Sequence, residues 1–391
     1  MNKASGFSTK KQTPSAELFY HALQNCHPNF VDLSDKFELL LASFIRFFRY
    51  LSPFALFGIG YLAFTKTGVY CWGPLLFMFA LIPLAELVLP PNANNLSEAE
   101  EQIAKSNPIY DVLLWAVVPA QWTMLVIFLF SFSQANLNPW DILGRVVGMG
   151  LLCGAFGINV AHELGHRNKP FEQFLAKSLL LSSLYMHFFI EHNKGHHKHV
   201  ATPKDPSTAS YRQNLYMFLI QTFVGTQREA WKIAIQEARK KNRRLPWLCN
   251  EMALFQSIQI ALLFILFFSF GLPIMCFFVA SAFIGAGLLE TVNYIEHYGL
   301  TRKQVNEHLY ERVQPAHSWN SNHLLGRLML FELSRHSDHH YLASRKYQVL
   351  RHFDDAPQMP TGYPGMIILA LFPPLWFRVM HHQMRKYSLL P

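Results

Sequence analysis

Residues 252–270 read MALFQSIQIALLFILFFSF and residues 273–292 read PIMCFFVASAFIGAGLLETV, with only Gly271 and Leu272 between them. A helix that crosses a lipid bilayer needs roughly 20 mostly apolar residues, and each run approaches that length. The glycine and the proline at the junction favour a tight turn. We therefore expect two spanning helices joined as a hairpin.

Four further apolar runs precede this hairpin. They cover residues 44–64, 69–89, 112–132 and 142–161. The first run is the weakest because Arg46 and Arg49 lie near its start. A later apolar run, residues 366–377, contains Pro373 and Pro374 and is too short to span, so we expect it in the core or at the membrane interface. The sequence predicts an all-α membrane protein with six transmembrane helices.

The basic residues predict how these helices are oriented. The linker 132–140 has no lysine or arginine, whereas residues 167–248 and 301–386 contain many, and such loops remain in the cytoplasm. Residues 1–17 are polar and lack the apolar core of a cleavable signal peptide, so we expect a cytoplasmic amino terminus. The expected segments are a cytoplasmic amino-terminal part (1–43), four spans (44–161), a cytoplasmic segment (162–251), two spans (252–292) and a cytoplasmic carboxyl-terminal part (293–391).

Composition narrows the classes of partner. The chain has 391 residues, is 51% hydrophobic and carries a formal charge of +9. In a membrane protein this charge favours anionic lipid or an acidic protein over nucleic acid. The cysteines stand singly, at Cys26, Cys71, Cys153, Cys249 and Cys276. Without a C-x-x-C pair the chain offers no iron–sulfur or rubredoxin-like centre, so any electrons must come from outside.

Nine of the 19 histidines fall in four clusters, each at or beyond the expected cytoplasmic end of a span. The clusters are HELGH (162–166), EHNKGHH (191–197), NYIEHYGL (293–300, with His297) and HSDHH (336–340). Histidines four residues apart on a helix lie one turn apart on one face, so two of them can bind one metal ion. In the second and third of the multi-histidine clusters, a pair in helical register is accompanied by an adjacent histidine that points elsewhere and can serve a second metal.

Nine imidazoles exceed what one ion can bind, so we expect two metal sites that share them. Imidazole suits iron, copper, zinc and nickel alike. Neighbouring carboxylates are candidates to accept hydrogen bonds from the free ring N–H groups and so orient the rings. These carboxylates are Glu163, Glu191, Asp205, Glu296 and Asp338.

Two other interpretations of the histidines remain open at this point. The pattern His162-Glu163-x-x-His166 is also that of zinc proteases, in which the glutamate is a general base, but it leaves the other seven histidines without a role. A metal transporter or metal-storage protein is the non-enzymatic alternative. An ion path would need ionisable residues within the spans, but the middle of the spans is almost free of them, with Glu86 near the end of the second and Glu290 near the end of the sixth, which disfavours transport.

At these motifs the chain resembles the bacterial integral-membrane alkane 1-monooxygenase family, within the wider group of histidine-box desaturases and hydroxylases. The resemblance rests on residues 162–166, 191–206, 293–300 and 333–340, with support from 317–323 and 347–365. It runs from about the third span to near the carboxyl end. Residues 1–35 carry no family landmark, and Leu333-Ser334-Arg335 stands where relatives often have Leu-Gln-Arg.

The resemblance implies a non-haem di-iron centre at the cytoplasmic mouth of a six-helix bundle in the bacterial inner membrane. The centre would use O2 to hydroxylate the terminal methyl group of a medium- or long-chain alkane, with electrons from rubredoxin and its NADH-dependent reductase. The residues that match the family's iron ligands are His162, His166, His192, His196, His197, His297, His336, His339 and His340. A related hydroxylase or desaturase acting on an aryl methyl group, a fatty acyl chain or a terpene is the alternative within the group.

An alkane substrate is consistent with a membrane protein because alkanes dissolve in the hydrocarbon core of the bilayer. Aromatic and aliphatic residues of the spans are candidates to line its channel, namely Trp72, Phe77, Trp115, Trp122, Phe283 and Leu288. Rubredoxins are typically acidic, so basic residues beside the clusters are candidates to dock the donor. These are Lys194, Lys198, Lys204 and Arg335.

Overall fold

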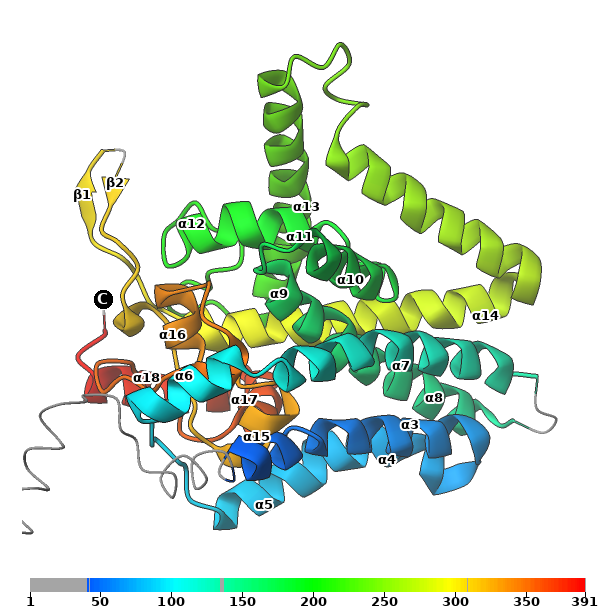
Figure 1. The fold of residues 1–391 in the computed structure, drawn as a ribbon, viewed down its shortest axis with the longest axis horizontal. Helices are drawn as coiled ribbons and strands as arrows, with labels where there is room; N and C mark the ends of the chain where they lie inside the picture. The colour runs from blue at the N-terminus through cyan, green and yellow to red at the C-terminus, as the bar shows by residue number, and fades with distance from the viewer. Residues whose placement is uncertain (1–40, 42, 134–136, 308, 391) are drawn as a thin grey trace, which may run out of the picture.

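The computed structural model describes residues 41, 43–133, 137–307 and 309–390. Most of the expected amino-terminal segment 1–43 therefore lies outside the described residues. The described chain is mostly helical (Figure 1), and its strands form one short antiparallel pair, β1 (Gln304–Asn306) and β2 (Leu309–Tyr310). The predicted all-α class is confirmed.

Five helical segments within the described residues are long and apolar enough to cross a membrane. They are Ser43–Thr65, Gly68–Val88, Ile109–Ser131, Pro139–Gly165 and Glu251–His297. Each agrees to within a few residues with an expected apolar run, and the last segment contains both runs of the expected hairpin.

The 47-residue segment α14 (Glu251–His297) is broken at Gly271, where the backbone has φ 80° and ψ 170°. A positive φ is accessible to glycine because it has no Cβ, and Pro273 cannot continue the hydrogen-bond ladder of the preceding turn. Figure 1 shows α14 turning back sharply along its length. Two helical arms therefore meet at the position that the sequence indicates.

The second arm of α14 lies deep in a bundle with α3 (Ala55–Thr65), α7 (Ile109–Ser131) and α8 (Pro139–Leu152), as Figure 1 shows. Small residues allow α8 and α14 to approach closely. A Cβ added at Gly285 would lie 2.6 Å from the Cβ of Cys153 and 2.9 Å from the carbonyl oxygen of Gly150. Close backbone approach through small residues is a common way for helices to pack in membranes.

Within the described residues, three turns are π-helical: η3 (Phe77–Leu81), η4 (Cys153–Ile158) and η5 (His192–His196). Each shifts the following residues out of ordinary α-helical register, and such turns are frequent at functional sites. The first two lie within the second and fourth candidate spans, and the third contains a histidine cluster.

Arg145 is a buried charge within the fourth candidate span. Its guanidinium donates to the carbonyl oxygens of Ser131 at 2.6 Å and Lys66 at 2.9 Å. These contacts link the ends of three neighbouring spans. The expectation that the middle of the spans is almost free of ionisable residues is therefore wrong at Arg145, whose charge is stabilised by backbone carbonyl oxygens.

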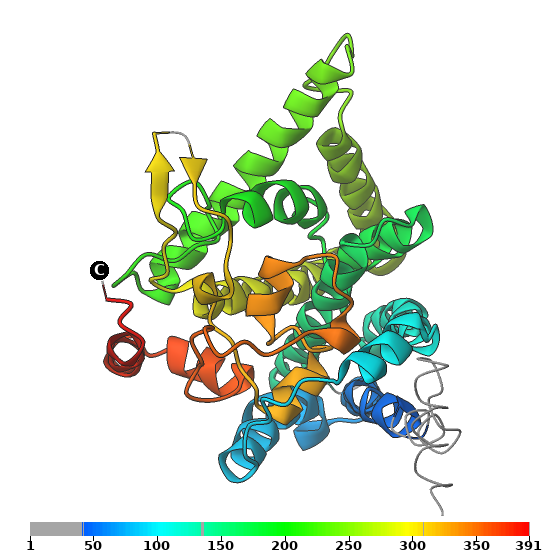
Figure 2. The same ribbon diagram turned by 60° about the vertical axis from the view of Figure 1, so that its left-hand side comes forward.

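Short helices gather at one end of the bundle, and α16 (His336–Tyr341) is one of them (Figures 1 and 2). It carries HSDHH, which we call the third histidine box, after HELGH (first) and EHNKGHH (second). The apolar run expected at 366–377 forms the end of α17 (Tyr363–Ala370) and the start of α18 (Pro373–Lys386), where the fully buried Trp376 packs on Tyr294. The remaining helices are η1 (Ser52–Phe54), η2 (Gly68–Trp72), α4 (Gly73–Leu76), α5 (Ile82–Val88), α6 (Glu98–Ser106), α9 (Asn159–Gly165), α10 (Pro170–Leu181), α11 (Phe188–Glu191), α12 (His197–His199), α13 (Leu215–Lys240), η6 (Pro315–His317), α15 (Leu324–Met329) and η7 (Tyr347–Val349).

Candidate metal centre

The nine clustered histidines meet at one place in the fold, in two groups. The five-histidine group contains His162, His166, His192, His197 and His339, and the four-histidine group contains His196, His297, His336 and His340. Within each group the possible ligand atoms all lie within 4.8 Å of one another. The side chains come from α9, η5 with α12, the end of α14, and α16.

The spacing of the ring nitrogens suits metal coordination. The Nε2 atom of His197 lies 3.0 Å from Nε2 of His192 and 3.1 Å from Nε2 of His339. The Nε2 atoms of His196 and His340 lie 3.2 Å apart. Two imidazole nitrogens bound about 2.1 Å from one ion lie about 3.0 Å apart when the angle between the bonds is near 90°. The rings are therefore already arranged as ligands of a common centre would be.

Two buried nitrogens support the same interpretation. The Nε2 atoms of His162 and His166 are buried and have no hydrogen-bond partner among the described residues. A buried polar atom without a partner costs roughly 1–3 kcal/mol, and coordination to a metal removes that cost. Neutral imidazole is a good ligand for iron, copper, nickel and zinc, so the residues present fit a histidine-bound metal.

Burial keeps these histidines in the form that binds metal. It lowers the pKa of His166 to about 3, with smaller contributions from the charges of His196 and Arg167. Burial first, and then the neighbouring histidines, lower the pKa of several others well below the ordinary value, namely His192, His197, His336, His339 and His340. These six rings are neutral at pH 7, so their lone pairs are available for coordination.

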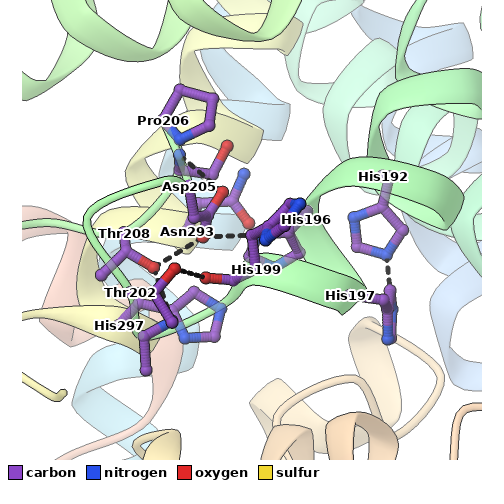
Figure 3. Close-up of polar contacts among 12 residues, drawn as sticks. His192, His196, His197, His199, Thr202, Asp205, Pro206, Thr208, Asn293 and His297 are labelled. Carbon is purple, nitrogen blue, oxygen red and sulfur yellow. Dashed lines mark hydrogen bonds and ion pairs between the residues drawn. The ribbon is translucent and has the colours of Figure 1, made fainter. Parts of the chain in front are cut away.

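The π-helical turn η5 decides how the second cluster divides. On an α-helix His192 and His196 would share a face, since they are four residues apart. In η5 the turn is widened, and His192 instead faces His197, five residues away, while His196 points to the other group (Figure 3). In α16 the ordinary register holds, because His336 and His340 share a group and His339 belongs to the other.

The two groups adjoin each other. The rings of His197 and His340 have centroids 4.5 Å apart, and those of His336 and His339 are 5.5 Å apart. Each pair of chain-adjacent histidines, 196 with 197 and 339 with 340, gives one side chain to each group. The arrangement can hold two ions side by side.

Asp205 is the carboxylate that lies behind a histidine ring. Its Oδ2 atom is 2.9 Å from Nδ1 of His196 and accepts a hydrogen bond of 2.6 Å from Thr208 (Figure 3). Burial raises the pKa of Asp205, but His196 and the hydrogen bonds from His196 and Thr208 outweigh it, so the net pKa is lowered. A carboxylate at Nδ1 leaves Nε2 free for a metal. Sequence reasoning missed Thr208, although it follows Asp205 by only three residues.

Glu296 has a different position. Its Oε2 atom lies 3.1 Å from Nε2 of His336, the nitrogen that also faces Nε2 of His297 at 3.2 Å. Its other oxygen accepts a 2.6 Å hydrogen bond from the Tyr363 hydroxyl. The carboxylate therefore lies on the ligand side of the four-histidine group. Tyr363 was not singled out, although it falls in the supporting motif at 347–365.

The other three carboxylates have no hydrogen bond to a histidine among the described residues. Glu163 accepts from Arg167 at 2.5 Å and from the backbone N–H of Tyr347 at 3.2 Å. Asp338 accepts from the backbone N–H of Arg351 at 2.7 Å. Oε1 of Glu191 is buried and has no hydrogen-bond partner in the part of the chain that the structure describes. Glu163 and Asp338 thus link the first and third histidine boxes to the segment that contains Tyr347 and Arg351.

Comparison with known proteins agrees with this site. The fatty acid desaturase family model matches residues 141–370, which include all nine histidines. Alkane 1-monooxygenase 2 of Pseudomonas aeruginosa is 42% identical over 324 residues, covering 81% of this chain and 84% of the relative. An alkane 1-monooxygenase of Pseudomonas putida is 35% identical over 337 residues, covering 85% and 83%.

This chain belongs to the alkane 1-monooxygenase family. A more distant relative is the xylene/toluene monooxygenase hydroxylase component XylM of Pseudomonas putida, which is 28% identical over 281 residues, covering 71% of this chain and 74% of the relative.

Four basic residues were expected to dock an electron donor, and for Arg335 this prediction is wrong. Its side chain is buried, with 3% of its surface exposed, and donates to the carbonyl oxygens of Leu350 at 2.6 Å and Asn94 at 2.8 Å. Lys194 is paired with Glu237 at 2.7 Å. Lys198 and Lys204 are exposed, so they remain candidates.

A small apolar cavity of about 30 Å³ lies between the candidate spans. It is lined by both π-helical turns of the spans, through Phe79 and Gly154, by Leu288 of α14, and by Asn159. Asn159 precedes the ligand candidate His162 by one helical turn. Of the six channel candidates, Leu288 alone lines this cavity; Phe283, for example, is exposed and stacks on Phe223.

Proposed function

We propose that this chain is an alkane 1-monooxygenase that converts the terminal methyl group of medium- or long-chain n-alkanes into a primary alcohol. The balanced reaction is R–CH3 + O2 + 2 e⁻ + 2 H⁺ → R–CH2OH + H2O. The observation that carries the proposal is the pair of buried histidine groups in a chain whose relatives are alkane 1-monooxygenases.

A terminal methyl group has no acidic proton, no leaving group and no dipole, so side-chain acid–base or nucleophilic catalysis has nothing to act on. A metal must supply the oxidising chemistry. We assign two iron ions, one to the five-histidine group and one to the four-histidine group, and when bound they would activate O2 with electrons from the donor. Histidine-rich ligation leaves the irons more positively charged than carboxylates would, which favours their reduced form.

The protein's own contribution is orientation and exclusion of water. Asp205 holds the ring of His196 with Nε2 turned toward the four-histidine group. The Tyr363 hydroxyl holds Glu296 beside His336. Burial of the rings lowers their affinity for protons, so protons compete less with iron for the lone pairs.

The apolar cavity marks where the end of the substrate would lie, since about 30 Å³ is room for little more than one methyl group. Much of its lining comes from the second, fourth and last candidate spans, and it includes Asn159, one turn before His162. A methyl terminus that enters between η3 and η4 would reach the five-histidine group without meeting bulk water. We therefore place the substrate entrance within the bilayer.

The electron donor is proposed to be a rubredoxin, reduced by its NADH-dependent reductase. Lys198 adjoins the ligand candidate His197, and both Lys198 and Lys204 are exposed without an acidic partner among the described residues. Such basic residues would attract an acidic donor to this surface.

We place the protein in the bacterial inner membrane with six spans. The two arms of α14 on either side of Gly271 count as separate spans in this proposal. The histidine boxes and the short helices around them would then form a cytoplasmic cap, in agreement with the basic residues of 167–248 and 301–386.

An aryl methyl substrate is the second candidate, because XylM is also a relative. Its identity of 28% is lower than the 35–42% of several alkane 1-monooxygenases. Comparing turnover of dodecane and p-xylene by one preparation distinguishes the two.

The deciding experiment is elemental analysis of the detergent-purified protein, followed by dodecane turnover with rubredoxin, its reductase and NADH. We expect about two irons per chain and 1-dodecanol as product. Zinc in place of iron, together with no O2 consumption, would overturn the proposal and return HELGH to the protease interpretation.

A further inference from the structure

A strongly basic segment lies between α13 and α14, outside the histidine centre. Five of the six residues 239–244 are lysine or arginine. The segment continues into exposed apolar side chains at Leu245, Trp247 and Leu248, with 61% of Trp247 exposed. Figure 1 shows this connection at the tip of the α13–α14 pair, away from α16.

This segment borders a surface pocket of about 630 Å³ between the end of α13 and the start of α14. Lys241 and Arg243 line it together with the apolar Leu248 and Leu254. Pockets that bind small molecules have volumes of roughly 300–1,000 Å³. The pocket therefore combines a cationic rim with an apolar wall at a suitable size.

The charge of the pocket is positive because its acidic residues are already paired. Glu237 pairs with Lys194 at 2.7 Å, and Glu251 pairs with Lys177 at 2.7 Å. Neither Lys241 nor Arg243 has an ion pair within the part of the chain that the structure describes. Their two positive charges remain for a ligand from outside.

The backbone holds these cations in place. Asn242 adopts a positive φ of 53°, and the N–H of Arg243 donates to the carbonyl oxygen of Ala238 at 3.1 Å. This is the hydrogen bond of a helix C-terminal cap, in which the chain turns back over the last helical turn. The cap thus fixes the backbone of Arg243 beside the pocket.

The pocket lies where α14 begins, at the level of the lipid headgroups if this arm spans the bilayer. Leu254, one turn into α14, is largely exposed, as is expected for a side chain that faces acyl chains. Trp247 is a residue type enriched at membrane interfaces. The cations of the pocket therefore face headgroups and its apolar wall faces the start of the acyl region.

We propose that this pocket binds the phosphate headgroup of an anionic phospholipid, such as phosphatidylglycerol. Lys241 and Arg243 would bind the phosphate, while Leu248 and Leu254 would contact the upper acyl chains. Clusters of lysine and arginine next to a spanning helix attract anionic lipid headgroups.

The test compares two double variants with the same loss of charge. K241Q/R243Q removes the cations that line the pocket, whereas R239Q/K240Q removes two from the same basic run outside it. Each purified protein is delipidated and placed in phosphatidylcholine nanodiscs, and binding of added phosphatidylglycerol is measured by native mass spectrometry. We expect roughly 30-fold weaker binding for K241Q/R243Q, because it loses two charge-assisted contacts to the phosphate. R239Q/K240Q keeps those contacts and should weaken binding less than threefold.

Equal weakening in both variants would overturn the pocket and leave only general attraction to a basic segment. Unchanged binding in K241Q/R243Q would overturn it as well. Competition by free glycerol phosphate at the same concentration as the lipid would show that the pocket binds soluble phosphate rather than lipid. An unchanged unfolding temperature and metal content show that the variants are folded, and neither readout depends on alkane turnover.

Discussion

The Nε2 atoms of His192 and His197 lie 3.0 Å apart across the π-helical turn η5. His197 also lies 3.1 Å from His339, so it joins two of the three boxes within the five-histidine group. We predict that His197→Ala lowers bound metal by about one ion per chain and lowers activity by more than about 100-fold, because a ligand is a stronger determinant of metal binding than the groups around it.

His199 provides a matched control for this prediction. It lies two residues further on and belongs to neither histidine group. His199→Ala should therefore keep its metal, measured by elemental analysis, and most of its activity. Loss of metal in His199→Ala alone would contradict the assignment.

The hydrogen bond between Asp205 and His196 leads to a second prediction. Asp205→Asn keeps the shape of the side chain but removes its charge, so it should lower metal affinity about 10–100-fold, the range found for groups that orient ligands. Titrating a chelator against the loaded protein measures the affinity. Asp354→Asn, at an exposed carboxylate near His352, should leave it unchanged. Equal affinities for the two variants would rule out an orienting role for Asp205.

Close packing of α8 and α14 predicts opposite effects at two glycines in one helix. Gly285→Ala places a Cβ 2.6 Å from that of Cys153 and should lower the free energy of unfolding by about 1–3 kcal/mol. Gly287 has no atom within 4 Å of such a Cβ, so Gly287→Ala should be neutral or stabilising, since alanine favours the helix by about 1 kcal/mol. Thermal unfolding in detergent measures both, and a destabilised Gly287→Ala would contradict the packing.

His187 predicts a pH dependence of stability that is separate from the metal ligands. Burial lowers its pKa to about 4, whereas an unfolded histidine titrates near pH 6.5. Between these values the unfolded chain binds a proton that the folded chain does not, so stability falls as pH falls from about 6.5 to about 4.

His187→Gln removes this titration. The free energy of unfolding of the wild type relative to His187→Gln should therefore fall by about 3 kcal/mol between pH 7 and pH 4. Chemical denaturation of both proteins at each pH cancels the contribution of the remaining histidines. A constant difference across this range would show that folding leaves the pKa of His187 unchanged.

Exposed lysines near the boxes predict how the donor is attracted. Lys198→Glu should raise the KM for rubredoxin severalfold and weaken the inhibition of electron transfer by salt, because it reverses one attractive charge. Lys232→Glu is the control, because Lys232 pairs with Glu229 on α13 rather than adjoining a histidine box. Rubredoxin oxidation at increasing ionic strength gives both quantities, and equal effects in the two variants would exclude a specific docking role for Lys198.

Local sequence was sufficient to locate the spans, the turn and the histidines. An apolar run of spanning length, such as 252–270, forms a helix because every backbone polar group in lipid must bond within its own segment. Gly271 and Pro273 break the helix through properties of their own backbones. The nine histidines could be singled out because their spacings, near the ends of spans, are those of helical ligands.

Tertiary packing alone decided how those histidines divide and which charges are available. The ordinary helical period pairs His192 with His196, but the additional residue in η5 pairs it with His197 instead, and a π-helical turn depends on packing rather than on local preference. Arg335 looked like a surface cation but is surrounded by the carbonyl oxygens of distant loops. Glu296 and Tyr363 meet across 67 residues. Spacing along the chain determines which residues share a helical face, whereas contacts between segments depend on how the whole chain packs.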